Sequence, residues 1–232
     1  MVRTKMTTIP EHINDDFSQK VIVNLDQVKW QPSPMPGVER KMLDRIGKEV
    51  ARATTVVRFL AGKAFSPHTH NGGEEFLVLN GVFSDETGHY GPLSYVRNPP
   101  GSSHTPFSKE GCEIFVKLCQ MRDEGEPDIQ IKADELEWEI VPGKRGVLRK
   151  PLFKASQWYE EVALEKRDSD CSIEPETFEH GAEVLILSGC LRDGQESYPT
   201  FSWVRYPYQA TASFQADEPV VYWIKRGINA PS

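Results

Sequence analysis

Apolar and polar residues alternate in short runs along this chain, and no segment keeps the 3.6-residue period of an amphipathic helix. Alternating or β-branched runs predict strands at 21–25, 53–60, 76–79, 93–97 and 113–118. Glycine- and proline-rich stretches such as 31–37 separate these runs and cannot be central strands. The pattern therefore predicts an all-β fold built from short strands, as in a barrel or sandwich.

The pattern occurs twice. The run GEEFLVLNG at 73–81 falls on GAEVLILSG at 181–189 when the chain is shifted by 108 residues. The same shift places Trp30 on Trp138 and Lys41 on Arg149, and we expect no gap across about a hundred residues. A tandem duplication of one small barrel follows from this repeat.

The repeat divides the chain into four predicted regions. They are an N-terminal arm (1–17), a metal-binding domain (18–120), a linker (121–127) and a degenerate domain without metal ligands (128–232).

One stretch of the first repeat has the spacing of a metal site. His68 and His70 are two residues apart, so on a strand both imidazoles leave the same face. Glu74 follows after a glycine bend, and His104 comes at a later turn. Three imidazole nitrogens and one carboxylate can close around a divalent metal, so we predict His68, His70, Glu74 and His104 as its ligands.

The second repeat lacks these ligands. At the four equivalent positions it has Glu176, Phe178, Ala182 and Ala212. One carboxylate cannot hold a divalent ion against water, so we predict a packed barrel filled by Phe178 together with Trp223. The expected stoichiometry is one metal ion per chain, and His180 is interpreted as a surface residue.

The sequence motifs of the first repeat resemble those of a known family. The pattern Gly62-x5-His68-x-His70-x3-Glu74-x6-Gly81 is similar to the first cupin motif, and Pro99-x-Gly101-x2-His104 is similar to the core of the second. Two positions differ, because Leu93 and Ser108 stand where the second motif has glycine and asparagine. Between about 30 and 118 the sequence resembles the cupin domain of ChrR-type anti-sigma factors. The resemblance implies a bicupin, that is, two double-stranded β-helix (jelly-roll) barrels, with zinc as its metal and a regulatory or stress-sensing role.

The ChrR resemblance also implies a sigma factor as partner. In that family a separate zinc module with an H-x3-C-x2-C pattern grips the sigma factor. Here no cysteine precedes Cys112, so this route to sigma binding is missing from the sequence.

Composition narrows the function further. The net charge of −7 argues against nonspecific binding to nucleic acid or to an anionic membrane surface. No apolar run is long enough to span a membrane, and the N-terminus does not read as a signal peptide. Four cysteines without a C-x-x-C pair favour a reducing, cytoplasmic setting in which the thiols are small core residues.

Three functions stay open at this point. The first is a stand-alone metal-binding sensor of a small-molecule ligand or oxidant. The second is a metal-dependent dioxygenase or isomerase acting on a small diketone-like or phenolic substrate. The third is a structural bicupin stapled by its metal. Zinc is the expected ion, with iron, manganese and nickel as alternatives, and a homodimer is the expected assembly.

Several neighbours of the ligands have two interpretations. Glu75 is expected to point away from the metal, either into a contact between strands or into solvent. Arg97 recurs as Arg205, where no metal is expected, which favours a structural ion pair or a contact between the halves over catalysis. Six residues have two interpretations, as lining of the barrel beside the metal or as core packing: Phe59, Phe76, Val78, Tyr95, Phe107 and Phe115.

Overall fold

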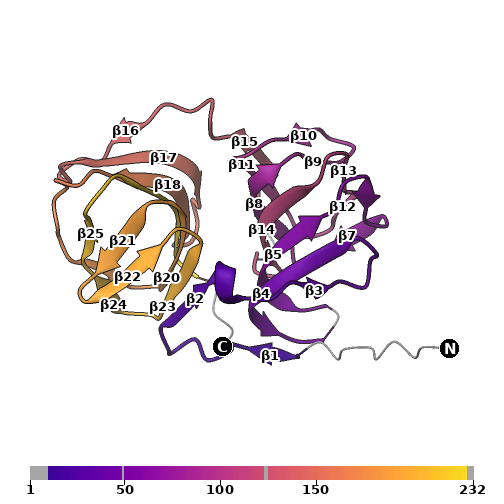
Figure 1. Ribbon diagram of the computed structural model, residues 1–232, viewed down its shortest axis with the longest axis horizontal. Coiled ribbons are helices and arrows are strands. Elements are labelled where there is room, and N and C mark those ends of the chain that lie inside the picture. Colours follow the sequence, from indigo (N-terminus) through magenta and orange to yellow (C-terminus); the bar gives the residue numbers. More distant parts are fainter. Residues whose placement is uncertain (1–9, 49, 123–124, 229–232) are drawn as a thin grey trace.

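The computed structural model describes residues 10–48, 50–122 and 125–228 and shows two β-barrels side by side (Figure 1). Within these residues the fold is all β apart from one 3-10 helix, η1 (Leu25–Gln27). The predicted pair of jelly-roll barrels is confirmed. No described helix has the length and apolar character that crossing a membrane requires.

The first barrel consists of one large antiparallel sheet and two small ones. In spatial order the large sheet contains β1 (His12–Ile13), β4 (Val38–Ile46), β5 (Arg52–Phe59), β14 (Cys112–Leu118), β8 (Glu74–Gly81), β11 (Ser94–Asn98) and β15 (Ile129–Lys132), with β3 (Gln31–Pro32) paired to β4. The small sheets are β10 (His89–Tyr90), β9 (Phe83–Ser84), β13 (Phe107–Ser108) and β6 (Lys63–Ala64), and the pair β12 (Ser102–His104) and β7 (His68–His70).

The second barrel repeats this plan. Its large sheet contains β16 (Glu139–Ile140), β17 (Val147–Lys154), β18 (Glu161–Arg167), β26 (Val220–Arg226), β20 (Ala182–Ser188), β23 (Ser202–Tyr206) and β2 (Val21–Asn24). Its small sheets are the pair β19 (Glu176–Phe178) and β24 (Ala210–Ala212), and the trio β22 (Glu196–Pro199), β21 (Cys190–Asp193) and β25 (Phe214–Ala216).

The two repeats exchange their first strands. Strand β2 belongs to the first repeat in sequence but pairs with β23 of the second barrel, where Val21 lies opposite Arg205. Strand β15 belongs to the second repeat but pairs with β11 of the first barrel, where Ile129 lies opposite Arg97. Figure 1 shows β2 on the side of the second barrel and β15 beside β11. The predicted domain limits at 18–120 and 128–232 stay a prediction, but the sheets cross them in both directions.

Part of the predicted arm is ordered against the first barrel. His12 and Ile13 form β1, the edge strand of the large sheet, and pair with β4. The guanidinium of Arg205 lies over the ring of Phe17, with Cζ of Arg205 3.9 Å from the centre of that ring. Residues 1–9 of the arm, and 123–124 of the predicted linker, lie outside the described residues.

The prediction that the repeat has no gap is wrong in one segment. Lys41 Nζ donates to the carbonyl of Leu25 at 2.7 Å, and Lys150 Nζ donates to the carbonyl of Ala133 at 2.7 Å. Leu25 and Ala133 keep the 108-residue shift, so the structural counterpart of Lys41 is Lys150 and not Arg149. The second repeat therefore has one extra residue before β17.

Three apolar clusters hold the molecule together, one inside each barrel and one between the two large sheets. The middle cluster contains Tyr95, Phe115 and Trp223, with the rings of Phe115 and Trp223 5.1 Å apart. Of the two interpretations of Tyr95 and Phe115, core packing is therefore confirmed and lining of the metal barrel is not. The prediction that Trp223 fills the second barrel is wrong. Odd and even positions of a strand face opposite sides of its sheet, and these three face the partner barrel.

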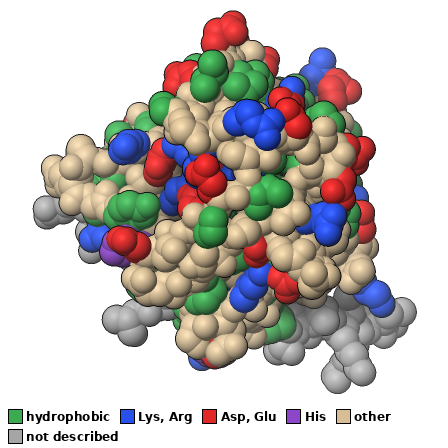
Figure 2. All heavy atoms as spheres, turned by 90° about the vertical axis from the view of Figure 1, so that its left-hand side faces the viewer, with side chains coloured by type: hydrophobic (Ala, Val, Ile, Leu, Met, Phe, Trp, Pro, Cys, Tyr) green, Lys and Arg blue, Asp and Glu red, His purple; other side chains and the backbone are tan. Residues whose placement is uncertain are grey.

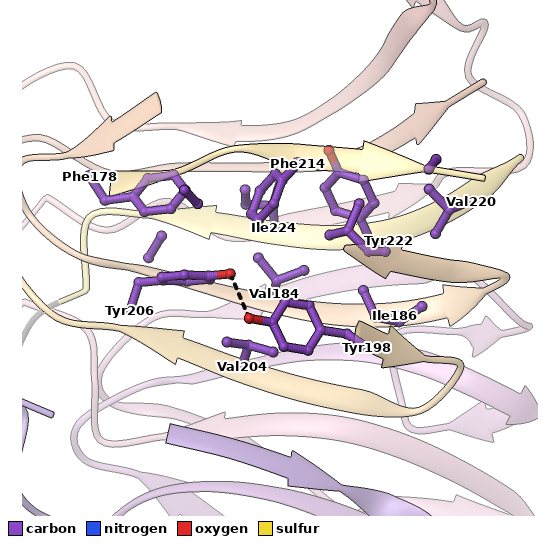
Figure 3. Close-up of a cluster of buried hydrophobic side chains, with 14 of the residues drawn as sticks. Phe178, Val184, Ile186, Tyr198, Val204, Tyr206, Phe214, Val220, Tyr222 and Ile224 are labelled. Atoms are coloured by element: carbon purple, nitrogen blue, oxygen red, sulfur yellow. Dashed lines mark hydrogen bonds between the residues drawn. The ribbon is translucent and has the colours of Figure 1, made fainter. Parts of the chain in front are cut away.

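The second barrel is packed as predicted, with Phe178 in its interior. The ring of Phe178 lies 5.2 Å from that of Tyr206 and 6.2 Å from that of Phe214. Figure 3 shows these rings near one another in the barrel interior, together with Tyr198 and Tyr222. On the outside of this barrel, basic and acidic side chains are interspersed across the face that Figure 2 presents.

The recurrent arginines bridge the two halves, which confirms the contact interpretation. Arg97 Nη1 donates to Glu160 at 2.8 Å, and Arg205 Nη1 donates to Asp44 at 3.2 Å. Glu75 is buried and its Oε2 pairs with Lys225, so the solvent alternative for Glu75 is wrong.

Two non-glycine residues hold a conformation that the cupin motif gives to glycine. Leu93 stands at the motif's glycine position and has φ of +64°, and its repeat counterpart Phe201 has φ of +63°. The turn before β11 and the turn before β23 therefore keep the left-handed geometry without the glycine, at a cost of about 1 kcal/mol each.

Gly81 ends β8 and is required by its close contact with another turn. Its φ is +70°, and a Cβ there would lie 2.1 Å from the carbonyl oxygen of Gly111. We expect Gly81→Ala to lower the free energy of unfolding by about 3 kcal/mol, because both the backbone and its neighbour must shift. Urea unfolding measures this change.

Gly62→Ala is the matched control. Gly62 has φ of +71° but open space around the added Cβ, so only the conformational cost of about 1 kcal/mol remains. Equal losses at the two positions would contradict the steric argument.

Candidate metal centre

Strands β7 and β12 bring the three predicted histidines together. The two strands pair antiparallel with His104 opposite His68. Alternation along β7 then puts His68 and His70 on one face. One ring nitrogen from each of the three histidines lies within 4.8 Å of the others. The structure thus places His68, His70 and His104 as the sequence predicted.

Glu74 lies at the start of β8, beside two of these rings. Its Oε2 is 3.4 Å from Nε2 of His70 and 3.6 Å from Nε2 of His104. The carboxylate is buried and accepts a hydrogen bond from Nδ2 of Asn98 at 2.9 Å. Glu74 as a ligand stays a prediction, and its position next to the ring nitrogens agrees with it.

The rings are oriented by acceptors on their outer nitrogens. His68 Nδ1 lies 2.8 Å from the carbonyl oxygen of Ser66, and His104 Nδ1 lies 3.1 Å from Oδ2 of Asp85. These contacts assign the proton to Nδ1 and leave the Nε2 lone pairs directed at the centre. The Nε2 atoms of His70 and His104 are 2.9 Å apart.

The protonation states of His70 and Glu74 bear on whether the site can bind a cation. Burial, together with His104 and His68, lowers the pKa of His70 to about 3, so at neutral pH this ring is in the neutral, metal-binding form. Burial raises the pKa of Glu74, as expected for a carboxylate held out of water. A divalent ion would oppose the raised pKa of Glu74, because it favours the ionised carboxylate, and it would act in the same direction as burial on His70, because it favours the neutral imidazole.

Asp85 and Asn98 are the supporting residues that sequence reasoning missed. Burial works against ionisation of Asp85, but hydrogen bonds from His104 and Thr87 lower its pKa to about 2. Asn98 lies opposite Glu74 in the pairing of β11 with β8. In the sequence, Asn98 directly precedes the proline of the second motif. This position next to the motif was the signal that could have identified Asn98 as a supporting residue.

His68, His70 and Glu74 line a cavity of about 410 Å³ in the first barrel. Its wall is mostly apolar and includes Phe59, Phe65, Phe83 and Ile114. Of the predicted lining residues, Phe59 is on this wall, Phe76 and Val78 belong to the core cluster of the barrel, and Phe107 is exposed. A volume of this size is in the range of small-molecule sites.

Comparisons with known proteins identify the fold. Residues 18–122 match the model of the ChrR cupin-like domain. A dioxygenase candidate from Nostoc punctiforme has a similar structure, with a TM-score of 0.73 and 14% identity over 93% of this chain and 85% of that one. An oxalate decarboxylase of Bacillus subtilis has a TM-score of 0.61 and 13% identity over 90% of this chain and 77% of that one. By fold, the chain is a bicupin.

Its first half resembles one particular protein in sequence. The anti-sigma-E factor ChrR of Cereibacter sphaeroides is 31% identical over 91 residues. This stretch is 39% of the present chain and 41% of that relative, so more than half of ChrR has no counterpart in the match.

The sequence also made predictions for the four cysteines and for His180, in both barrels. The four cysteines are free thiols, with Cys112 and Cys171 buried and Cys119 and Cys190 half-buried. His180 is exposed, as predicted, and its ring lies 4.8 Å from that of Tyr159.

Glu74 and Glu75 are adjacent but face different partners, which makes them a matched pair. We expect Glu74→Gln to weaken metal binding at least tenfold without unfolding the chain, since it removes the anionic donor and keeps its volume. Competition with a chromophoric chelator measures this affinity.

Glu75→Gln should change metal affinity far less, since Glu75 pairs with Lys225 between the barrels. It should instead lower the free energy of unfolding by about 3–5 kcal/mol, because it removes the charge of one partner of a buried ion pair. Equal loss of metal by the two variants would overturn the assignment of ligand and neighbour.

Proposed function

We propose that this protein binds one divalent metal ion in its first barrel and uses it to detect a small molecule or oxidant, in a regulatory role. The observation that carries the proposal is the group of His68, His70 and His104 beside the buried Glu74. Of these four residues, His68, His70 and Glu74 line a cavity. The similarity of residues 18–122 to the ChrR cupin-like domain supports a regulatory role.

Zinc is the metal we propose for this site. Three imidazoles and one carboxylate suit zinc, and they also suit manganese or iron(II). Manganese(II) centres have been described in the Bacillus subtilis oxalate decarboxylase of similar fold. A bound ion would supply a Lewis acid, and His68, His70, His104 and Glu74 would hold it.

The proposed role does not require the sigma-binding module of ChrR. The given sequence does not contain the H-x3-C-x2-C pattern, and the metal barrel is the part of the chain to which we assign sensing. A sigma factor as partner and a homodimer as assembly stay predictions of the sequence.

Elemental analysis tests the metal site. We expect close to one metal ion per chain, and its loss in the double variant His68→Ala with His70→Ala. The second barrel has Phe178 and Ala182 at positions equivalent to His70 and Glu74, and these side chains are packed in its core. Two ions per chain, or an ion that survives the double substitution, would show that the site is elsewhere.

A metal-dependent dioxygenase is the second candidate. The observation in its favour is the cavity of about 410 Å³ on which three of the predicted ligands (His68, His70 and Glu74) open, since a substrate could enter there. A solved structure described as a dioxygenase candidate has the same fold.

Oxygen uptake separates the two candidates. A sensor should bind acetylacetone or a related diketone with less than one turnover of oxygen per bound metal. Sustained oxygen consumption by the iron(II)-loaded protein, absent from the His68→Ala variant, would favour the enzyme instead.

A further inference from the structure

The two central strands β5 and β14 form much of the wall of the cavity in the first barrel. Besides Thr55 they contribute these apolar lining residues: Ala53, Val57, Phe59, Ile114, Val116 and Leu118. The cavity also reaches three of the predicted metal ligands, His68, His70 and Glu74. A molecule in this cavity would therefore touch the predicted ligands with one part and apolar side chains with another.

Strand β5 has small side chains where its repeat counterpart has long acidic ones. Strands β18 and β26 of the second barrel pair in the same register as β5 and β14, 108 residues further along the chain. Glu161 therefore stands at the place of Ala53, and Glu165 at the place of Val57. Glu165 is buried in the second barrel. The first barrel thus lacks two large side chains that the second has at this wall.

The neighbouring strand shows the same difference. Tyr222 and Arg226 of β26 stand where β14 has Ile114 and Leu118. Both are buried and both bind Glu165, with the Tyr222 hydroxyl donating to Oε2 at 2.6 Å and Arg226 Nη2 donating to Oε1 at 2.9 Å. The second barrel thus fills this space with polar side chains that bind one another, while the first keeps shorter apolar side chains around a cavity.

Short apolar side chains around open space favour an apolar occupant. A polar group placed against them would lose its hydration without gaining hydrogen bonds. An apolar group would gain about fourfold in affinity for each methylene that it removes from water. The substitutions between the repeats therefore specify the chemistry of the part of a ligand that lies against β5 and β14.

From this difference we propose that the cavity binds a small molecule with two parts, a polar head beside His68, His70 and Glu74 and an uncharged alkyl or aryl body against β5 and β14. The head would be a group that binds metals through oxygen atoms. Aliphatic and aromatic compounds with such a head are the fitting class, and wholly polar molecules such as sugars are outside it. The inference rests on the proposed metal site and names the class of its ligand.

A series of hydroxamic acids that differ only in the tail tests the inference. Acetohydroxamate, hexanohydroxamate and octanohydroxamate share one metal-binding head and lengthen the alkyl chain. Titration calorimetry on the full chain, loaded with zinc and checked for metal content, should show octanohydroxamate binding at least about a hundredfold more tightly than acetohydroxamate. The heat-capacity change of binding should become more negative along the series, because it reports the burial of apolar surface.

Val57→Phe should remove most of this preference, because the larger ring occupies part of the space for the tail. We expect weaker binding of octanohydroxamate and little change for acetohydroxamate, whose head contacts remain. Val82→Phe is the matched control, since Val82 is exposed and is not one of the residues that line the cavity, and it should leave both affinities unchanged. The wild-type series tests the inference even if Val57→Phe fails to fold.

The outcomes separate this inference from the metal proposal. Equal affinities along the series, or no binding of any member to the zinc-loaded protein, overturns the inference and leaves the metal site standing. A tail preference that Val57→Phe does not reduce places the tail outside the cavity and overturns the inference as well. Failure of the wild-type chain to take up more metal than His68→Ala removes the proposed function itself, before any probe is added.

Discussion

Two buried ion pairs in opposite directions hold the barrels face to face, and the rest of the architecture depends on them. Glu75 of the first barrel pairs with Lys225 of the second, and Glu183 of the second pairs with Lys117 of the first, at 2.6 Å. Glu183 and Lys225 are the repeat counterparts of Glu75 and Lys117. Removing one partner of such a pair leaves a charge in the dry interior, a loss of about 3–5 kcal/mol. These pairs therefore fix which faces of the two large sheets meet.

Fixing that interface also fixes the metal centre. Glu74 and Glu75 are neighbours on β8, so when Glu75 turns toward the partner barrel, Glu74 must turn into its own. Asn98, which holds Glu74, is likewise adjacent to Arg97, which binds Glu160 across the interface. The orientation of the predicted carboxylate ligand thus follows from contacts made outside the barrel that contains it.

Sequence reasoning predicted what depends on local spacing. The alternation within 68–70 placed two imidazoles on one face, and the repeat register placed Phe178 inside the second barrel. It failed where both faces of a sheet are buried. Period-two alternation does not say which face meets the barrel interior and which meets a second sheet. For Tyr95 and Phe115 it therefore left barrel lining and core packing open, and both residues pack in the core between the barrels. The supporting contact of Asp85 with His104 joins residues 19 apart in sequence and follows no spacing rule.

The exchange of β2 and β15 has a consequence for how such a chain could arise. Each barrel is completed by the leading strand of the other repeat, so neither repeat contains all the strands of one closed barrel. A chain with a single repeat could close the same sheets only by donating its first strand to a second copy and receiving one in return. That arrangement is a strand-swapped dimer with twofold symmetry. Joining the copies makes the swap intramolecular, independent of protein concentration, and leaves one copy free to lose its metal ligands.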